Sequence, residues 1–448
     1  MSASTRDRWC GRVAWLTILA LAASLTYRND QTNRSQVNGE ITVDDIRIRV
    51  TGEELIGFKT VGVLVRPTRS PQPTQNQEPI IRQMDQAARS PRDKLHVAVI
   101  AGEMLGGKQA LARLEALSRS PIPSDLAADI ASLQTIYSSN AGALDPASKA
   151  RLIQRQDYFA RVALSFGVPS NVEPRKSIES GARRAVIALG FVGVLLLMLL
   201  IGAVGSFILA VVLHVKGKLH RMYVPNPSAN TAFLEGFAIY FSLFIIGLGL
   251  LRRYFGLTSL QWEWLAWMII PIVTGWLSLR GVTGDERRDA LGWHKGKGVF
   301  REIAAGIGGY LAGIVVMIVG FILTYVLIAR SGISPEHPLV HILQGDRWHV
   351  LGLYALVSVF APVIEETMFR GALFHHLRRR WGWAITAPIV SFIFAIIHPQ
   401  GWVAVPVLGS IAVVLAALRE WRGSLIAPMV AHAFNNFIAL SVALAVFR

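Results

Sequence analysis

The chain has 448 residues, of which 52% are hydrophobic and only 17% are charged. A soluble globular domain carries about 25% charged residues, so this composition excludes a wholly soluble enzyme and a disordered chain. The formal net charge is +16, from 45 Lys and Arg against 29 Asp and Glu. The single cysteine, Cys10, excludes an intramolecular disulfide framework and a cysteine-based zinc site.

Residues 1–27 combine a basic start with a short apolar run. Arg6, Arg8 and Arg12 precede the run from Val13 to Tyr27, which is 15 residues long. A membrane span needs about 20 apolar residues. We therefore interpret 1–27 as either a signal peptide or a short signal anchor, and both would send the following segment across the membrane.

Residues 28–182 are predicted to form a mainly helical accessory domain that carries a short β segment. The alternating or continuous β-branched residues of 41–50 and 60–66 predict two strands. Apolar residues at helical spacing predict helices over 96–117 and 146–166. No catalytic motif is evident in this segment, which we interpret as an accessory or interaction domain.

Residues 183–448 are almost continuously apolar and predict a multi-helix membrane domain. The expected fold class is therefore an all-α polytopic membrane protein with about eight transmembrane segments in this part of the chain. The segments are expected near 185–215, 232–251, 263–279, 304–329, 349–374, 383–398, 402–418 and 424–447.

Basic residues in the short loops predict the orientation of the chain. With the N-terminus in the cytoplasm, the cytoplasmic tail and loops would hold 17 basic residues and the outside positions 5. This is the bias of the positive-inside rule, so a nucleic-acid partner is not expected. We expect an integral protein of a bacterial inner or plasma membrane, with 28–182 extracytoplasmic. His375 and His376, next to three arginines, are expected at the membrane surface near anionic lipid.

A set of polar side chains lies inside the last apolar segments. An ionisable group at mid-depth in a bilayer costs about 2.5–3.5 kcal/mol or more, so such groups usually mark function. The candidate site residues are Glu365, Glu366, Arg370, His398, His432 and Asn436. A carboxylate base, a histidine and N–H donors for an oxyanion suit hydrolysis of an amide by water.

Helix spacing assigns different roles to these candidates. Glu366 and Arg370 are four residues apart with the acid first, which favours a salt bridge on one helix face. Glu365 lies about 100° around the helix and lacks that partner, so it is the better candidate for a general base. His432 and Asn436 are also four residues apart and would point into one space as oxyanion donors.

Three motifs follow one another along the last apolar segments. They are Glu365-Glu366-x-x-x-Arg370, Phe394-x-x-x-His398 and His432-x-x-x-Asn436. Together they resemble the motifs of the CAAX prenyl endopeptidases and bacterial Abi-type membrane proteins, often called the CPBP family. The resemblance covers about residues 345–448 by motif and does not cover 1–182.

The resemblance implies an intramembrane endopeptidase, which in eukaryotic members serves CAAX-box protein maturation. The substrate would be a membrane protein or a lipidated peptide. On the family's pattern, Glu365 with His398 would activate water, and His432 with Asn436 would form the oxyanion site. Glu366 and Arg370 would support the carboxylate of Glu365 or the substrate.

Two alternatives stay open at the level of sequence. Glu365, His398 and His432 could bind zinc in a metalloprotease-like site, since two imidazoles, a carboxylate and an open position suit that ion. No HExxH motif is present, and we favour a metal-free site without a cofactor. The alternative to an enzyme is a membrane scaffold or bacteriocin-immunity-like protein that uses the same polar cluster for helix packing or ligand binding.

Overall fold

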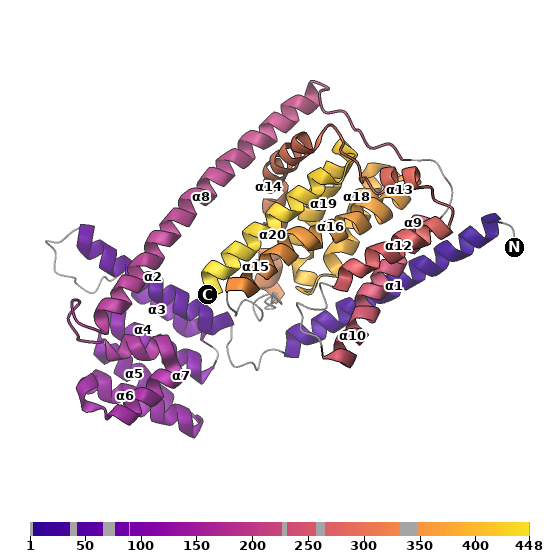
Figure 1. Cartoon of the computed structure of the whole chain (residues 1–448). Helices are drawn as coiled ribbons and strands as arrows, with labels where there is room; N and C mark the ends of the chain where they lie inside the picture. The colour runs from indigo at the N-terminus through magenta and orange to yellow at the C-terminus, as the bar shows by residue number, and fades with distance from the viewer. Residues whose placement is uncertain are drawn as a thin grey trace. The chain divides into compact units, whose positions relative to one another are not determined.

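The structure is a computed structural model of the whole chain, shown in Figure 1. It describes residues 3–35, 43–65, 77–88, 90–225, 231–256, 265–331 and 347–447. The chain divides into two compact units. Unit 1 comprises Met1–Val37 and Met198–Arg448, and unit 2 comprises Asn38–Leu197.

Unit 2 is built from helices throughout its described residues. They are α2 (Val43–Val65), α3 (Glu78–Ala87), α4 (Pro91–Leu105), α5 (Gly107–Ser118), α6 (Ser124–Ser138), the 3-10 turn η2 (Ala141–Ala143), α7 (Pro146–Leu164) and the first part of α8 (Arg175–Val215). The helix predicted over 96–117 is interrupted at Gly106, whose φ of 99° suits glycine. The helix predicted over 146–166 is α7, which begins after the capping residue Asp145.

The short β segment predicted for the accessory domain is wrong for the described residues. The two expected strands and the stretch between them form the single helix α2 over residues 43–65. Residues 41–42 and 66 of the expected strands lie outside the described residues. The buried positions of α2 recur at helical spacing, at Ile48, Gly52, Leu55 and Ile56. Packing of this face therefore overrides the β propensity of its valines and isoleucines, because that propensity depends strongly on context.

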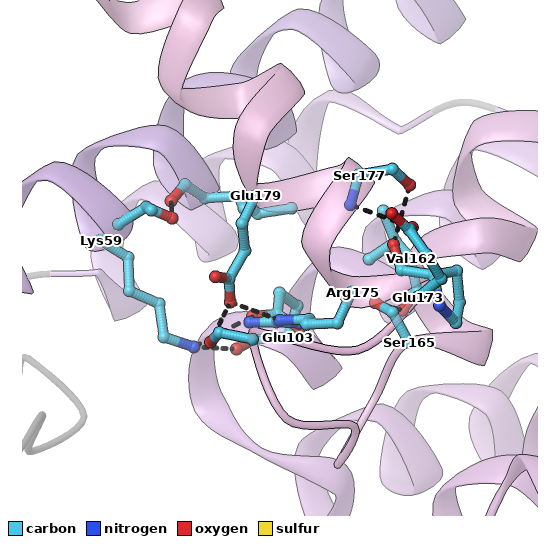
Figure 2. Close-up of polar contacts among 12 residues, drawn as sticks. Lys59, Glu103, Val162, Ser165, Glu173, Arg175, Ser177 and Glu179 are labelled. Atoms are coloured by element: carbon cyan, nitrogen blue, oxygen red, sulfur yellow. Dashed lines mark hydrogen bonds and ion pairs between the residues drawn. The ribbon is translucent and has the colours of Figure 1, made fainter.

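A buried carboxylate joins three helices of unit 2 (Figure 2). Glu103 of α4 accepts hydrogen bonds from Lys59 of α2 at 3.0 Å and from both terminal nitrogens of Arg175 at the start of α8, at 2.6 and 2.7 Å. Arg175 also donates to Glu179 of the same helix. Burial opposes ionisation of Glu103, but the bonds and charges of Arg175 and Lys59 outweigh it and lower the pKa of this carboxyl below its usual value.

Unit 1 is also helical in its described residues. In its first part lie α1 (Ala3–Ser35), the rest of α8, α9 (Ala232–Ser242), the π-helix η3 (Leu243–Gly247), α10 (Leu248–Phe255), the 3-10 turn η4 (Ala266–Met268), α12 (Ile269–Leu279), α13 (Gly284–Ala290) and α14 (Val299–Ser331). After these come α15 (Arg347–Ala355), the π-helix η6 (Leu356–Phe360), α16 (Ala361–Glu366), the π-helix η7 (Thr367–Leu373), α17 (Phe374–Arg378), α18 (Trp383–Ile396), the 3-10 turn η8 (Trp402–Ala404), α19 (Val405–Arg422) and α20 (Ile426–Phe447).

Seven helical runs in the described residues are long and apolar enough to cross a membrane. They are Thr5–Tyr27, Arg175–Val215, Ala232–Phe255, Val299–Ser331, Arg347–Arg378, Trp402–Arg422 and Ile426–Leu444. Six of the eight predicted segments of 183–448 are among them, and the other two are the shorter apolar helices Ala266–Leu279 and Trp383–Ile396. The predicted all-α, polytopic fold is confirmed for the described residues, and the protein is an integral membrane protein.

The N-terminal helix α1 packs into the core of unit 1. Its side chains Ala14, Ile18 and Leu25 are buried in the same apolar cluster as residues of α9 and α18. At its start, Asp7 forms an ion pair with Arg280, which follows α12. Helix α1 is therefore longer than the 15-residue apolar run and is part of the unit that holds the candidate site.

Candidate active site

The predicted site residues converge from three stretches of unit 1. Glu365 and Glu366 end α16, and Arg370 lies in the π-helix η7 that follows directly. His398 lies just beyond the last residue of α18, whereas His432 and Asn436 lie on α20. Because π-helical segments occur frequently at functional sites, their presence on both sides of the two glutamates is consistent with a site here.

A fully enclosed acid, arginine and histidine form the centre of this cluster. Glu366 and Arg370 are both 0% exposed, and Arg370 Nη1 donates to Glu366 Oε1 at 2.9 Å. The same oxygen lies 2.9 Å from His432 Nδ1 on α20. Arg370 also donates to the main-chain oxygen of Ala412 on α19 at 3.0 Å. The predicted Glu366–Arg370 pair therefore exists and connects α16 and η7 to two other helices.

Glu365 occupies a different environment from its neighbour. Its side chain is 26% exposed, and its Oε2 lies 3.8 Å from His432 Nε2. Nδ1 of His432 thus bonds Glu366, and its Nε2 faces Glu365. The two bonded residues, His432 and Glu366, lie 66 residues apart along the chain. The sequence predicted that Glu365 lacks the arginine partner, and Arg370 indeed bonds to Glu366.

The hydrogen bonds of the two histidines define which nitrogen carries the proton. An ionised carboxylate can only accept, so Nδ1 of His432 donates to Glu366, and Nε2 faces Glu365. His398 Nδ1 contacts the main-chain oxygen of Phe394, which also only accepts. Nδ1 of His398 is therefore the donor in this contact.

The ring of Phe394 contacts both site histidines and the guanidinium of Arg370. It lies 4.4 Å from the ring of His398 and 5.8 Å from that of His432, measured between centroids. The guanidinium carbon of Arg370 lies 4.7 Å from its centroid. Phe394 therefore brings the second motif into contact with residues of the other two motifs.

Asn436 contacts an earlier part of the helical run that carries the two glutamates. Its side-chain nitrogen donates to the main-chain oxygen of Val357, in the π-helix η6, at 2.9 Å. Its side-chain oxygen accepts from Asn435, whose own oxygen accepts from Tyr310 of α14. A carboxamide has two N–H groups, so one of those of Asn436 fixes α20 against η6 while the second can serve another acceptor.

The expected surface position of His375 and His376 is wrong. Both side chains are only 2% exposed. His375 Nδ1 lies 2.7 Å from the hydroxyl of Tyr223, and its ring packs on Phe233 of α9. These histidines are therefore core residues of α17, which packs against α9.

The described residues do not present a ready-made metal site. Within the described ranges, no three side chains of His, Cys, Asp or Glu are arranged so that one metal ion could be bound. His432 Nδ1 bonds Glu366 and His398 Nδ1 contacts the main chain, and histidines that bind a metal through the other ring nitrogen commonly make such contacts. Zinc binding by Glu365, His398 and His432 stays a prediction, as does the metal-free site.

Comparison with known proteins finds one family that matches part of the chain. Residues 347–438 match the family described as type II CAAX prenyl endopeptidase, Rce1-like. The matched region contains all six predicted site residues, so the resemblance read from the three motifs is confirmed. No curated protein and no solved structure was found to match the chain.

Proposed function

We propose that the protein is an intramembrane endopeptidase of the CAAX-protease type, which hydrolyses a peptide bond with water activated by Glu365. The observation that carries this proposal is the pair of glutamates on His432, with one carboxylate enclosed and paired and the other partly exposed. Such a division gives one acid a supporting role and leaves the other able to take a proton. The family of residues 347–438 supports the same reaction class.

The first step of the proposed reaction is attack by water. Glu365 removes a proton from a bound water molecule, and the oxygen of that water adds to the carbonyl carbon of the substrate. His398, whose Nδ1 contacts the main-chain oxygen of Phe394, orients the water from the end of α18. The second step is departure of the amine, which takes the proton back from Glu365, so that water is consumed and an acid and an amine are formed.

His432 and Asn436 are proposed to stabilise the oxyanion formed between these steps. For its Nε2 to donate, the imidazole of His432 must carry a second proton. The carboxylate of Glu366 at Nδ1 stabilises that charged form, just as a carboxylate does behind a catalytic histidine elsewhere. The second N–H of Asn436 supplies the other donor.

The proposed substrate is a membrane protein or a lipidated peptide. The site lies on helices long and apolar enough to span a bilayer, so a scissile bond must be brought to it at the membrane. The proposed steps use only side chains of this chain and need no metal. We expect exhaustive chelation to leave cleavage unchanged, and loss of cleavage that zinc restores would contradict this part of the proposal.

Substitution of the proposed groups tests the function. We expect Glu365→Ala, His398→Ala and His432→Ala each to lower cleavage of a membrane peptide by about 100-fold to 10,000-fold, because each removes a proton-transfer or charge-stabilising group. Glu235→Gln is the matched control, since Glu235 is another buried acid of a membrane helix and pairs with Arg280. Unchanged cleavage in all three variants, at equal protein level, would remove the enzyme hypothesis.

The proposed orientation has the N-terminus in the cytoplasm and residues 28–182 outside it, in a bacterial inner or plasma membrane. The excess of basic residues in the predicted cytoplasmic loops supports it. Cys10 is the only cysteine, so a Cys10→Ser chain that also carries Ser139→Cys has one label site, at an exposed position of unit 2. A membrane-impermeant maleimide should label it in intact cells, and labelling only after lysis would reverse the orientation.

A further inference from the structure

The loop that follows α13 contacts both helical stretches that carry the candidate site. Trp293 Nε1 donates to the hydroxyl of Thr367, the residue directly after Glu366, at 3.1 Å. One residue earlier, the main-chain oxygen of Gly292 accepts from the main-chain N–H of Leu425, just before α20, at 3.0 Å. We use the name positioning loop for residues 289–294, which comprise the last two residues of α13 and the loop after it.

The connection of this loop to the start of α20 has further bonds. Ser424 donates to the main-chain oxygen of His294 at 2.7 Å. The Nε2 of His294 in turn lies 3.1 Å from the main-chain oxygen of Gly423. The entry into α20, about two helical turns before His432, is therefore attached to the loop at three successive residues.

Arg419 of α19 lies between this loop and the π-helix η7. Its side chain is 0% exposed, and it donates to main-chain oxygens instead of to a carboxylate. Its Nε donates to the oxygen of Arg370 at 3.2 Å, and its Nη2 donates to that of Ala290 at 2.8 Å. A buried charge is costly, so a guanidinium held in this way must serve a local geometric purpose.

The fit between Arg419 and the loop is close. A Cβ added to Gly292 would lie 2.3 Å from Nη1 of Arg419, and Gly292 has a φ of 69°. Only glycine suits both the contact and this backbone conformation. Leu291 packs similarly against Gly371 of η7. A Cβ added to Gly371 would lie 3.1 Å from the side chain of Leu291.

We propose that Arg419 and the positioning loop set the relative position of η7 and α20, and thereby the bond between Glu366 and His432. Both belong to unit 1, and neither is part of the three motifs. Arg419 is a positioning residue, since it reaches Arg370 only through the main chain. The inference rests on the proposed function where it concerns catalysis, whereas its geometric part can be measured separately.

Replacement of Arg419 tests this proposal against a neighbour of the same type. Arg422 is the matched control because it is a buried arginine of the same helix that pairs with Glu302 of α14 at 2.7 Å. We expect Arg419→Gln to lower kcat by about 10-fold to 100-fold with KM within about threefold, since small misplacement of catalytic groups has effects of this size. Arg419→Lys should recover part of kcat, and Arg422→Gln should keep kcat within about threefold of the wild type.

Amide hydrogen exchange of the full-length protein in detergent supplies a readout that does not depend on cleavage. Arg419→Gln should speed exchange in peptides covering 365–373 and 426–436 more than Arg422→Gln, which removes the partner of the buried Glu302 instead. Equal effects of the two variants on exchange and on kcat, or wild-type values for Arg419→Gln, would overturn the proposal. If the wild type cleaves nothing, the proposed function fails, but the exchange comparison still decides the positioning role.

A milder variant covers the case in which Arg419→Gln does not fold. Trp293→Phe keeps the aromatic ring but removes the N–H that donates to Thr367. We expect faster exchange in 365–373, and the same change from Thr367→Val. Because the two residues share one bond, the double variant should add nothing to either single variant. Wild-type exchange in both single variants would contradict the proposal.

Discussion

Two buried glutamates, Glu103 in unit 2 and Glu366 in unit 1, both bind an arginine, but their remaining contacts differ. Both oxygens of Glu103 are occupied, because Arg175 bonds each of them and Lys59 bonds one. Glu366 uses only Oε1, which binds Arg370 and His432, while its Oε2 is buried without a hydrogen-bond partner.

The difference separates a structural acid from one that belongs to a site. A carboxylate saturated by cations has no capacity left for chemistry, and Glu103 can only hold α2, α4 and α8 together. Glu366 instead orients an imidazole whose other nitrogen reaches a second carboxylate, that of Glu365. An arginine beside a buried acid is thus poor evidence of function, whereas a histidine shared between two acids is much better evidence.

The largest expected effect comes from breaking the enclosed pair of unit 1. Arg370→Met leaves Glu366 as an uncompensated buried charge, which typically costs about 3–5 kcal/mol of stability. Thermal unfolding in detergent measures this loss. The double variant Glu366→Gln/Arg370→Met should recover much of the stability and still fail to cleave. A stable, active Arg370→Met protein would show that the pair has no role in the site.

The corresponding change in unit 2 should affect stability alone. Glu103→Gln leaves Arg175 and Lys59 facing an uncharged amide, with an expected loss of about 3 kcal/mol in the unfolding of unit 2. Cleavage by the folded fraction should be unchanged. Loss of cleavage without loss of stability would mean that unit 2 takes part in the reaction.

The pH dependence of unit 2 should show a smaller effect with a defined sign. The pKa of Glu103 is lowered in the folded state, so the unfolded chain binds its proton at a higher pH. The stabilisation is therefore complete above the ordinary glutamate pKa of 4.5 and is lost as the pH falls through the lower, folded value. Denaturant unfolding from pH 7 to pH 3 should show this loss, and Glu103→Gln should make the curve flatter. An unchanged slope would contradict the assignment.

The smallest expected effect concerns the N-terminal helix. We propose that α1 stays attached as a membrane anchor, because its buried face is part of the core of unit 1. Asp7→Asn breaks a partly exposed ion pair with Arg280 and should cost about 0.2–1 kcal/mol. Intact-mass measurement of the membrane-extracted protein should find residues 1–27 present. A mature chain that begins after this segment would restore the signal-peptide interpretation.

Local spacing was sufficient to predict part of this site. The Glu366–Arg370 bond follows from positions four apart on one helix, and the placement of His432 and Asn436 on α20 follows in the same way. The bond between His432 and Glu366 joins residues 66 apart, and no local pattern encodes it. The same applies to Arg419, whose partners Arg370 and Ala290 lie far along the chain.

The errors of prediction have similar physical causes. Helix α2 contains β-branched runs, but packing against α4 buries one helical face, and burial decided the outcome. His375 and His376 were expected at the surface from their basic neighbours, yet α17 packs against α9 and both side chains are buried. The apolar segments were predictable because bilayer thickness fixes their length and composition.

A side-by-side measurement of Glu365→Gln and Glu103→Gln tests the central claim most directly. Both variants are assayed for cleavage of one membrane peptide and for thermal unfolding in the same detergent. We expect Glu365→Gln to lose about 1,000-fold in cleavage with no loss of stability, since it removes a proton acceptor that no arginine pairs with. Glu103→Gln should lose stability and keep cleavage. Wild-type cleavage by a folded Glu365→Gln protein would contradict the account.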